Sequence, residues 1–265
     1  MKLYWLEQAA TDVPADSDWL SAGEATRLSA LRVPKRRSDW RLGRWTAKHA
    51  VAACLNLPGH SQALAGIEIR PADSGAPEVF FASQRAGVSI SLSHRAGVAA
   101  CAVAPLGTAL GCDLELIEPR SAGFLADYFT ADEQELVARA SPADRDRVVN
   151  LLWSAKESVL KALCVGLRQD CRCAIVRSVE GLLCQDRPWQ ISQLQNPPGQ
   201  NKDGRNGIDN PAAASLPGAS LWHPLQVAYT GGRVFQGWWQ QSDSLLRTMV
   251  ASPPSKPPVM LTGTA

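Results

Sequence analysis

The sequence lacks an excess of charge of either sign, and it lacks a hydrophobic run long enough to cross a membrane. With 27 Lys or Arg and 25 Asp or Glu, the 265 residues carry a formal net charge of only +2. This balance disfavours a protein that holds nucleic acid mainly by overall electrostatic attraction. The most apolar stretch, residues 96–112, is interrupted by Pro105 and runs into Asp113, so we expect no membrane span. Any anion-binding site must therefore be local.

The sequence also lacks a cysteine framework and the features of a signal peptide. Its seven cysteines are odd in number and include no Cys-x-x-Cys pair, so we expect reduced cysteines and a cytoplasmic protein. The first residues, MKLYWLEQAATDVPAD, contain no extended apolar segment. Hydrophobic residues make up 45% of the chain, which is enough to bury a sizeable core.

Helical periodicity recurs at several places along the chain. It predicts helices over residues 22–31, 36–55, 130–140 and 143–164. Two of these helices have a capping box at their start, Ser21 with Glu24 and Thr130 with Glu133.

Alternating polar and apolar residues predict strands between the helices. A short strand is expected over residues 2–6, and a β-hairpin joins VSISL (88–92) to VAACAVA (98–104) through SHRAG. Residues 108–118, TALGCDLELIE, predict another strand, and residues 224–240 predict a second hairpin across TGGR.

The order of these elements suggests two halves that meet near residues 105–108. We expect an N-terminal subdomain over residues 1–105 and a C-terminal subdomain over residues 106–240. Residues 193–219 are dense in Asn, Gly and Pro, which predicts a flexible insertion. The Pro-rich C-terminal segment cannot build a core, so residues 241–265 are expected to be a disordered tail.

Asp113 and Glu115 are two residues apart in the predicted strand 108–118. Side chains at this spacing point to the same face of a strand, so the two carboxylates can approach one ion. Oxygen ligands of this kind suit a hard cation such as Mg²⁺. An ordinary solvent-exposed strand face with two acids explains the pair equally simply.

Glu157 and Lys161 lie four residues apart in the predicted helix 143–164. They share a helix face, and a surface ion pair is the simple explanation. Trp153, Leu160 and Cys164 fall on the same side, which predicts partial burial and a more specific role.

Basic residues recur along one side of the predicted helix 36–55, at Arg37, Arg41, Arg44 and Lys48. This basic stripe fits a phosphate site, a solvated helix face or nucleic acid. His94 ends the serine-lined strand, where it fits either an anion site or an ordinary turn histidine.

Three segments in this order, SLSHRAG, GCDLE and WSAKESVLKA, resemble the motifs of the surfactin-type 4′-phosphopantetheinyl transferases. The resemblance spans residues 3–180. It implies an α+β fold of two similar subdomains related by a pseudo-twofold, with coenzyme A between them and no second subunit required. It also implies transfer of phosphopantetheine to a serine of an acyl, peptidyl or aryl carrier protein, with release of adenosine 3′,5′-bisphosphate.

The resemblance implies roles for individual residues. Asp113, Glu115 and Glu157 would hold Mg²⁺ against the coenzyme A pyrophosphate. Glu157 would act as the base, directly or through a metal-bound water, and Lys161 would meet the pyrophosphate.

Further residues would bind the rest of coenzyme A. His94, with Arg27, Arg44 and Lys48, would contact the 3′-phosphate, and Lys156 would have a supporting phosphate or ion-pair role. The loop DSGAPE, residues 73–78, resembles a loop near the adenine, although Ala76 replaces its usual basic residue. The alternative is a carrier-binding or nucleic-acid-binding module without turnover.

Overall fold

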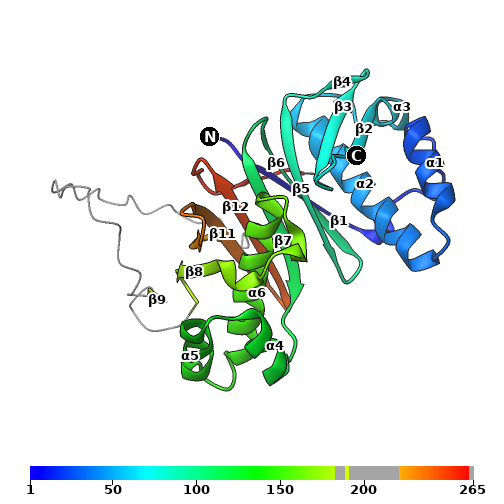
Figure 1. Cartoon of the computed structure of the whole chain (residues 1–265). Coiled ribbons are helices and arrows are strands. Elements are labelled where there is room, and N and C mark those ends of the chain that lie inside the picture. Colours follow the sequence, from blue (N-terminus) through cyan, green and yellow to red (C-terminus); the bar gives the residue numbers. More distant parts are fainter. Residues whose placement is uncertain (183–188, 191–220, 263–265) are drawn as a thin grey trace, which may run out of the picture.

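The computed structural model describes residues 1–182, 189–190 and 221–262 of the chain (Figure 1). These residues form a mixed α+β fold, as predicted, with two larger sheets and a small third sheet. None of the helices in these ranges is both long and apolar enough to cross a bilayer. The insertion predicted over residues 193–219 lies outside the described residues.

The first sheet has four strands in the order β13-β1-β6-β5. Its strands are β1 (Tyr4–Ala9), β5 (Val88–Arg95), β6 (Val98–Pro105) and β13 (Val259–Met260). The antiparallel pairing of β5 with β6 confirms the first predicted hairpin. Ala96 and Gly97 in its turn both have positive φ, +51° and +76°, which favours glycine at the second position.

The second sheet has six strands in the order β7-β12-β11-β10-β8-β9. These are β7 (Ala109–Leu116), β8 (Ala174–Val179), β9 (Trp189–Gln190), β10 (His223–Tyr229), β11 (Val234–Ser242) and β12 (Leu245–Ser252). β10 and β11 confirm the second hairpin. β7 confirms the strand predicted from TALGCDLELIE, and its pairing with β12 places Asp113 opposite Thr248.

A small third sheet was not predicted from the sequence. It contains β2 (Ile67–Pro71), β3 (Pro77–Phe81) and β4 (Gln84–Arg85), and α3 (Ser61–Ala65) precedes it. The turn between β2 and β3 is closed by a hydrogen bond from the Ala72 nitrogen to the Ala76 oxygen. This segment, residues 72–76, forms one wall of the main cavity described below.

All four predicted helices are present. They are α1 (Ala22–Ala30), α2 (Pro34–Cys54), α5 (Ala131–Arg139) and α6 (Arg145–Ala162). The capping boxes at Ser21 and Thr130 begin α1 and α5 as expected. The sequence did not predict α4 (Ala122–Tyr128) or the short 3₁₀ helices η1 (Ala10–Asp12), η2 (Gly166–Arg168) and η3 (Cys171–Cys173).

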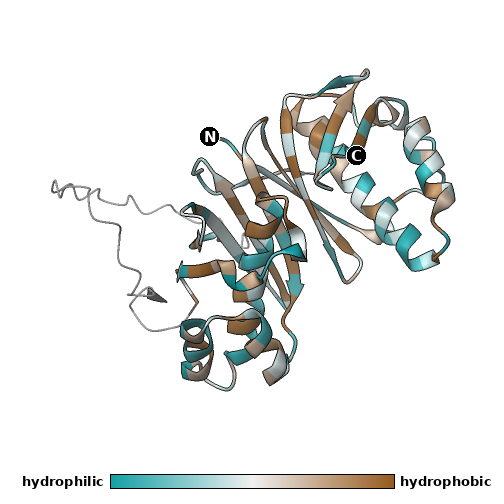
Figure 2. Cartoon of the chain, in the orientation of Figure 1, coloured by the Kyte–Doolittle hydropathy of each residue, from teal (hydrophilic) through white to brown (hydrophobic). Residues whose placement is uncertain are grey.

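Each larger sheet is packed against one long helix, α2 on the first and α6 on the second (Figure 1). A hydrophobic core lies under each of these helices. A third core lies between the sheets and includes Leu3, Trp5, Cys112 and Met249. Figure 2 shows mainly hydrophobic residues along the central strands and a hydrophilic segment at the start of α2. Because burying one such side chain contributes about 1.5–3 kcal/mol, this third core holds the two sheets together.

The C-terminal segment is not a disordered tail over its described part, so that prediction is wrong for residues 245–262. β12 is an internal strand of the second sheet, and β13 pairs with β1 of the first sheet. The Val259 nitrogen donates to the Leu3 oxygen, and the Leu261 nitrogen donates to the Trp5 oxygen. The segment contributes Leu246, Met249 and Val250 of β12 to the hydrophobic cores, and β13 satisfies main-chain groups of β1, which composition does not predict.

A buried lysine–glutamate pair occurs in each half of the chain. Lys48 Nζ of α2 lies 2.5 Å from Glu24, and Lys156 Nζ of α6 lies 2.8 Å from Glu133. Each glutamate also accepts a main-chain N–H from a neighbouring strand, from Ile69 for Glu24 and from Val176 for Glu133. The recurrence is in line with two similar subdomains, although their boundaries and their pseudo-twofold relation stay a prediction.

Candidate functional site

The two sheets meet where the serine face of β5 lies against β7. Ser91 Oγ accepts a hydrogen bond from the Cys112 nitrogen at 3.0 Å, and Ser93 Oγ accepts one from the Leu114 nitrogen at 3.2 Å. Where the two sheets meet, serine hydroxyls of β5 thus accept hydrogen bonds from the main-chain N–H groups of β7 in place of main-chain oxygens. The alternation of serines in SISLS therefore holds the acidic strand against the first sheet.

Gly111 allows α6 to approach β7 very closely. A Cβ atom at this position would lie 1.7 Å from the Ser158 oxygen and 2.7 Å from the Ala162 nitrogen. Both are main-chain atoms, so no side-chain movement could make room for it. The glycine in GCDLE therefore lets α6 bring Glu157 and Lys161 close to the acids of β7.

Asp113 is buried and has hydrogen-bond donors on both carboxylate oxygens. Its Oδ1 accepts from Lys161 Nζ at 2.8 Å and from Ser93 Oγ at 2.9 Å, and its Oδ2 accepts from Ser154 Oγ at 2.9 Å. Residues of β5 and α6 thus fix the orientation of a carboxylate on β7. The structure brings Asp113 and Lys161 together, which excludes the exposed strand face as an explanation for Asp113.

Lys161 does not form the simple ion pair with Glu157 that their spacing allows. Its ammonium instead contacts Asp113, Ser93 Oγ and the Cys112 oxygen. Burial acts to lower the pKa of Lys161, but the charge and hydrogen bond of Asp113, together with Cys112 and Glu157, outweigh it and the pKa is raised. Lys161 is therefore a fixed positive charge beside the carboxylates.

Glu157 is partly buried, as predicted, and its Oε1 is a buried atom that lacks a hydrogen-bond partner among the described residues. Burial and the neighbouring charges of Asp113 and Glu115 raise the pKa of Glu157 to about 7, and Lys161 only partly offsets them. Cys164, which was expected on the same buried side, is exposed just beyond the end of α6.

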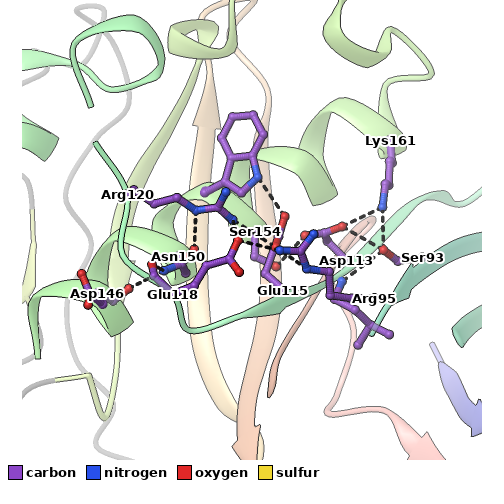
Figure 3. Close-up of polar contacts among 12 residues, drawn as sticks. Ser93, Arg95, Asp113, Glu115, Glu118, Arg120, Asp146, Asn150, Ser154 and Lys161 are labelled. Atoms are coloured by element: carbon purple, nitrogen blue, oxygen red, sulfur yellow. Dashed lines mark hydrogen bonds and ion pairs between the residues drawn. The ribbon is translucent and has the colours of Figure 1, made fainter. Parts of the chain in front are cut away.

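Glu115 is held by several donors (Figure 3). Trp153 Nε1 donates to its Oε1 at 3.1 Å, and Arg120 Nη2 donates to its Oε2 at 3.2 Å. Arg120 also donates through Nε to Asn150 of α6 at 2.8 Å, and Arg95 lies 3.5 Å from Glu115. Burial and Asp113 raise the pKa of Glu115 in spite of these cations.

The three predicted metal ligands are neighbours but do not form a closed ligand set. Within residues 1–182, 189–190 and 221–262, no group of three His, Cys, Asp or Glu side chains is arranged to hold a metal ion. Asp113 and Glu115 are engaged by Lys161 and Arg120. The chemistry nevertheless fits a hard cation, because the donors are carboxylates, and burial together with the charges of Asp113 and Glu115 raises the pKa of Glu157.

Adjoining cavities form a cleft along β5. The main cavity has a volume of 820 Å³, and residues of the turn 72–76 and of the segment 161–168 line it. A cavity of 410 Å³ adjoins it at Leu92 and Lys161 and reaches Asp113 and Glu115. Another, of 520 Å³, adjoins it at Trp40 and Arg44 and includes His94. The main cavity has the size of a typical small-molecule site.

Besides Lys161, three of the predicted coenzyme A residues line this cleft. Arg27 and Arg44 face the main cavity, and His94 faces the two smaller ones. Arg27 and His94 are exposed, whereas the Arg44 side chain is only 13% exposed and lies 3.6 Å from Glu24. The structure therefore brings these residues to one surface, although they come from α1, α2 and β5.

Lys48 and Lys156 do not reach the cleft, so their predicted phosphate contacts are wrong. Both side chains are fully buried and paired with Glu24 and Glu133. For Lys156, the ion-pair role that was also considered is the one observed. Burial lowers the pKa of Lys48, and Glu24 opposes that shift.

The basic stripe is not a continuous surface either. Arg37 donates to the Leu28 and Leu31 oxygens, and Arg41 donates to main-chain oxygens of residues 14–16. These contacts tie loops to α2. Because Lys48 is also buried, the stripe offers no continuous path for nucleic acid.

Sequence reasoning missed several residues of the site. Arg120 and Arg95 hold Glu115, and Arg168 lines the main cavity. Ser93, which hydrogen-bonds to Asp113, was also missed, although the sequence placed it on the serine face of the predicted strand. Arg120 lies in a loop, Arg95 ends β5 and Arg168 ends η2, and only the fold brings their partners near.

Comparison with known proteins identifies the segment that carries the acidic residues. Residues 109–205 match the model of the 4′-phosphopantetheinyl transferase superfamily. The matched segment contains β7 and α6, and hence Asp113, Glu115, Glu157 and Lys161. The match supports a transferase of phosphopantetheine in general, while the surfactin-type subfamily stays a prediction. No curated protein matches the chain.

Proposed function

We propose that the protein transfers 4′-phosphopantetheine from coenzyme A to a serine of an apo acyl, peptidyl or aryl carrier protein. Adenosine 3′,5′-bisphosphate is the second product. The observation that carries this proposal is that Asp113, Glu115 and Lys161, all within the superfamily segment, line one end of a cleft with cationic walls.

The reaction requires a proton acceptor and a positive charge near the pyrophosphate. The serine oxygen bonds to the phosphorus next to the pantetheine, and the bond from that phosphorus to the bridging oxygen breaks. Glu157 accepts the serine proton, because a pKa of about 7 suits a base near neutral pH. Lys161 stabilises the negative charge that develops on the leaving pyrophosphate oxygen.

A divalent cation is part of this proposal. Asp113, Glu115 and Glu157 would hold Mg²⁺, which when bound would neutralise phosphate charge. Ser93 and Ser154 orient Asp113, and Arg120 and Trp153 orient Glu115. These contacts place the carboxylates before substrate arrives.

The same cleft has residues for the rest of coenzyme A. Arg27, Arg44 and His94 bind the 3′-phosphate, and Lys48 and Lys156 have structural roles instead. All of these residues belong to one chain, so we expect a monomer to suffice.

The test of this function is a transfer assay with intact-mass detection. The protein is incubated with coenzyme A, Mg²⁺ and a panel of apo carrier proteins. We expect at least one carrier to gain the mass of one phosphopantetheine, and a carrier whose acceptor serine is replaced by alanine to gain none. No mass gain on any carrier, with Mg²⁺ or with Mn²⁺, contradicts the proposal.

Replacing Arg27 or His94 with glutamine should weaken coenzyme A more than dephospho-coenzyme A. Both side chains are exposed, so the substitutions should not disturb folding. A hydrogen bond to a charged group contributes about 1.5–3 kcal/mol, so each change should cost roughly tenfold or more in affinity for coenzyme A. Isothermal titration calorimetry measures both ligands.

The matched control for these variants is Arg139→Gln. Arg139 is an exposed arginine of α5 that pairs with Glu135 and lines none of the three cavities. Equal losses for coenzyme A and dephospho-coenzyme A would show that Arg27 and His94 bind another part of the ligand.

A further inference from the structure

Two unpaired guanidinium groups face the main cavity. Arg27 of α1 and Arg168 of η2 both line it, and neither has a carboxylate partner among the described residues. The other cations of its lining are paired, Arg44 with Glu24, Arg85 with Glu78 and Lys161 with Asp113. The roles proposed above include Arg27 but leave Arg168 without one.

Arg168 reaches across the cleft. Its Nη2 donates to the Ser74 oxygen at 3.1 Å, while its Nε donates to the Val165 oxygen at 3.2 Å. One side chain thus joins residues 161–168, on the α6 side, to the turn 72–76 on the other side. The Arg168 side chain is exposed and its acceptors are neutral carbonyls, so its guanidinium can bind a ligand without leaving a buried charge unpaired.

The turn 72–76 has no positive charge of its own. Its residues are Ala, Asp, Ser, Gly and Ala, and Gly75 has a φ of +87°. An anionic ligand that lies along this turn would therefore find its cation in the Arg168 guanidinium, which is hydrogen-bonded to the Ser74 oxygen. Arg85, in the same cavity lining, is already paired with Glu78.

The other cations of the cavity lining indicate which part of a ligand Arg168 would meet. Lys161 and Arg168 both line the main cavity, and so do Arg27 and Arg44. Because Arg27 and Arg44 are proposed to bind the 3′-phosphate, the nucleotide of coenzyme A would share this cavity with Arg168. A guanidinium suits this part because it binds phosphate through two parallel hydrogen bonds and stacks on aromatic rings.

We propose that Arg168 binds the nucleotide part of coenzyme A and closes the main cavity over it against the turn 72–76. This inference rests on the proposed function. It adds a binding residue that the sequence motifs do not mark, and it gives the contact between Arg168 and Ser74 a role in ligand affinity.

The experiment compares Arg168→Gln with Arg172→Gln in the full chain. Arg172 is an exposed arginine four residues further along, paired with Asp170 and absent from the lining of the three cavities. Isothermal titration calorimetry measures the affinities for coenzyme A, adenosine 3′,5′-bisphosphate and 4′-phosphopantetheine. Thermal unfolding confirms that both variants are folded.

We expect Arg168→Gln to weaken coenzyme A and adenosine 3′,5′-bisphosphate by about tenfold or more, since a charge-assisted contact is lost. Its affinity for 4′-phosphopantetheine should stay as in the wild type. Arg172→Gln should bind all three as the wild type does.

Three results would overturn the inference. Wild-type affinities in Arg168→Gln would show that Arg168 makes no contact with the ligand. Equal weakening of 4′-phosphopantetheine would place Arg168 at the wrong end of coenzyme A, and equal weakening in Arg172→Gln would reveal only a general effect of charge. In each of these cases the wild type still binds coenzyme A; a wild type that binds neither coenzyme A nor the bisphosphate instead refutes the proposed function itself.

Discussion

Replacing Glu157 with glutamine is expected to slow phosphopantetheine transfer by about 10²–10⁴-fold, the usual contribution of a positioned general base. The amide keeps the shape of the side chain but cannot accept the serine proton, and it removes one negative charge from the carboxylate cluster. Single-turnover transfer to an apo carrier at saturating coenzyme A measures this loss. Wild-type rates in the variant would contradict the role of Glu157 as the base.

The same substitution should raise stability at alkaline pH. Burial, Asp113 and Glu115 raise the pKa of Glu157 from 4.5 to about 7. The folded protein therefore binds this proton more tightly than the unfolded chain, so ionisation of Glu157 costs stability as the pH rises from about 4.5 to about 7. Glutamine avoids this cost, which is on the order of 1–3 kcal/mol.

Urea unfolding at pH 5 and pH 8 measures the effect on stability. The variant should differ little from the wild type at pH 5 and should be the more stable protein at pH 8. The control is Glu135→Gln on α5, because Glu135 is exposed and outside the cluster. A variant less stable than the wild type at pH 8 would mean that the negative charge of Glu157 is compensated in the fold.

A divalent cation provides a second measurement on the same residue. Mg²⁺ or Mn²⁺ should raise the melting temperature of the wild type, because binding to the folded state alone stabilises it. The rise should be smaller in Glu157→Gln. An equal rise in both proteins would exclude Glu157 from the proposed ligand set without affecting its proposed role as the base.

The elements that the sequence predicted are those whose signal is local. Both hairpins, the acidic strand β7 and the helices α1, α2, α5 and α6 follow from hydrophobic period and capping residues within each segment. The candidate site residues Asp113, Glu157 and Lys161 could be proposed because their motifs lie within single elements, and the structure then brings those elements together.

The features that the sequence did not predict depend on distant partners. β13 forms because it pairs with the edge of β1. Tyr4 and Val259, which face each other in this pairing, are more than 250 residues apart in the sequence. Arg120 and Arg168 gain their positions from the packing of α6 and from the turn 72–76. No local pattern marks such residues.

The phosphate contacts assigned to Lys48 and Lys156 are wrong for the same reason. Lys48 was grouped with the basic residues that recur along its helix, and Lys156 was given a supporting phosphate or ion-pair role from its place in the motif WSAKESVLKA. Each lysine side chain points to a buried carboxylate on another helix, Lys48 to Glu24 and Lys156 to Glu133. A lysine pattern on one helix therefore cannot distinguish a buried ion pair from a phosphate site.

Replacing Lys156 with methionine is expected to lower the free energy of unfolding by about 3–5 kcal/mol, the usual cost of leaving one partner of a buried ion pair behind. Glu133 is fully buried, and without Lys156 its carboxylate keeps only neutral donors, the main-chain N–H groups of Thr130 and Val176 and the Thr130 hydroxyl. Lys48→Met should cost less, because Glu24 keeps Arg44 at 3.6 Å as a second cation. Urea unfolding measures both variants.

The control separates a structural lysine from the lysine of the same helix that is proposed to act in catalysis. The Lys161 side chain is 28% exposed, and Asp113 keeps Ser93 and Ser154 as donors when Lys161 is removed. Lys161→Met should therefore cost less stability than Lys156→Met. It should nevertheless slow transfer by about 10²–10³-fold, because it removes positive charge from the leaving group.

A double replacement decides whether the loss in Lys156→Met comes from the unpaired carboxylate. Glu133→Met added to Lys156→Met removes the stranded charge, and buried ion pairs replaced by hydrophobic residues of similar volume are often tolerated. The double variant should therefore recover part of the stability that Lys156→Met loses, although Glu133→Met also removes the acceptor for Val176. Full stability of Lys156→Met, combined with weakened binding of coenzyme A, would contradict this account and would return Lys156 to the phosphate role that the family resemblance implied.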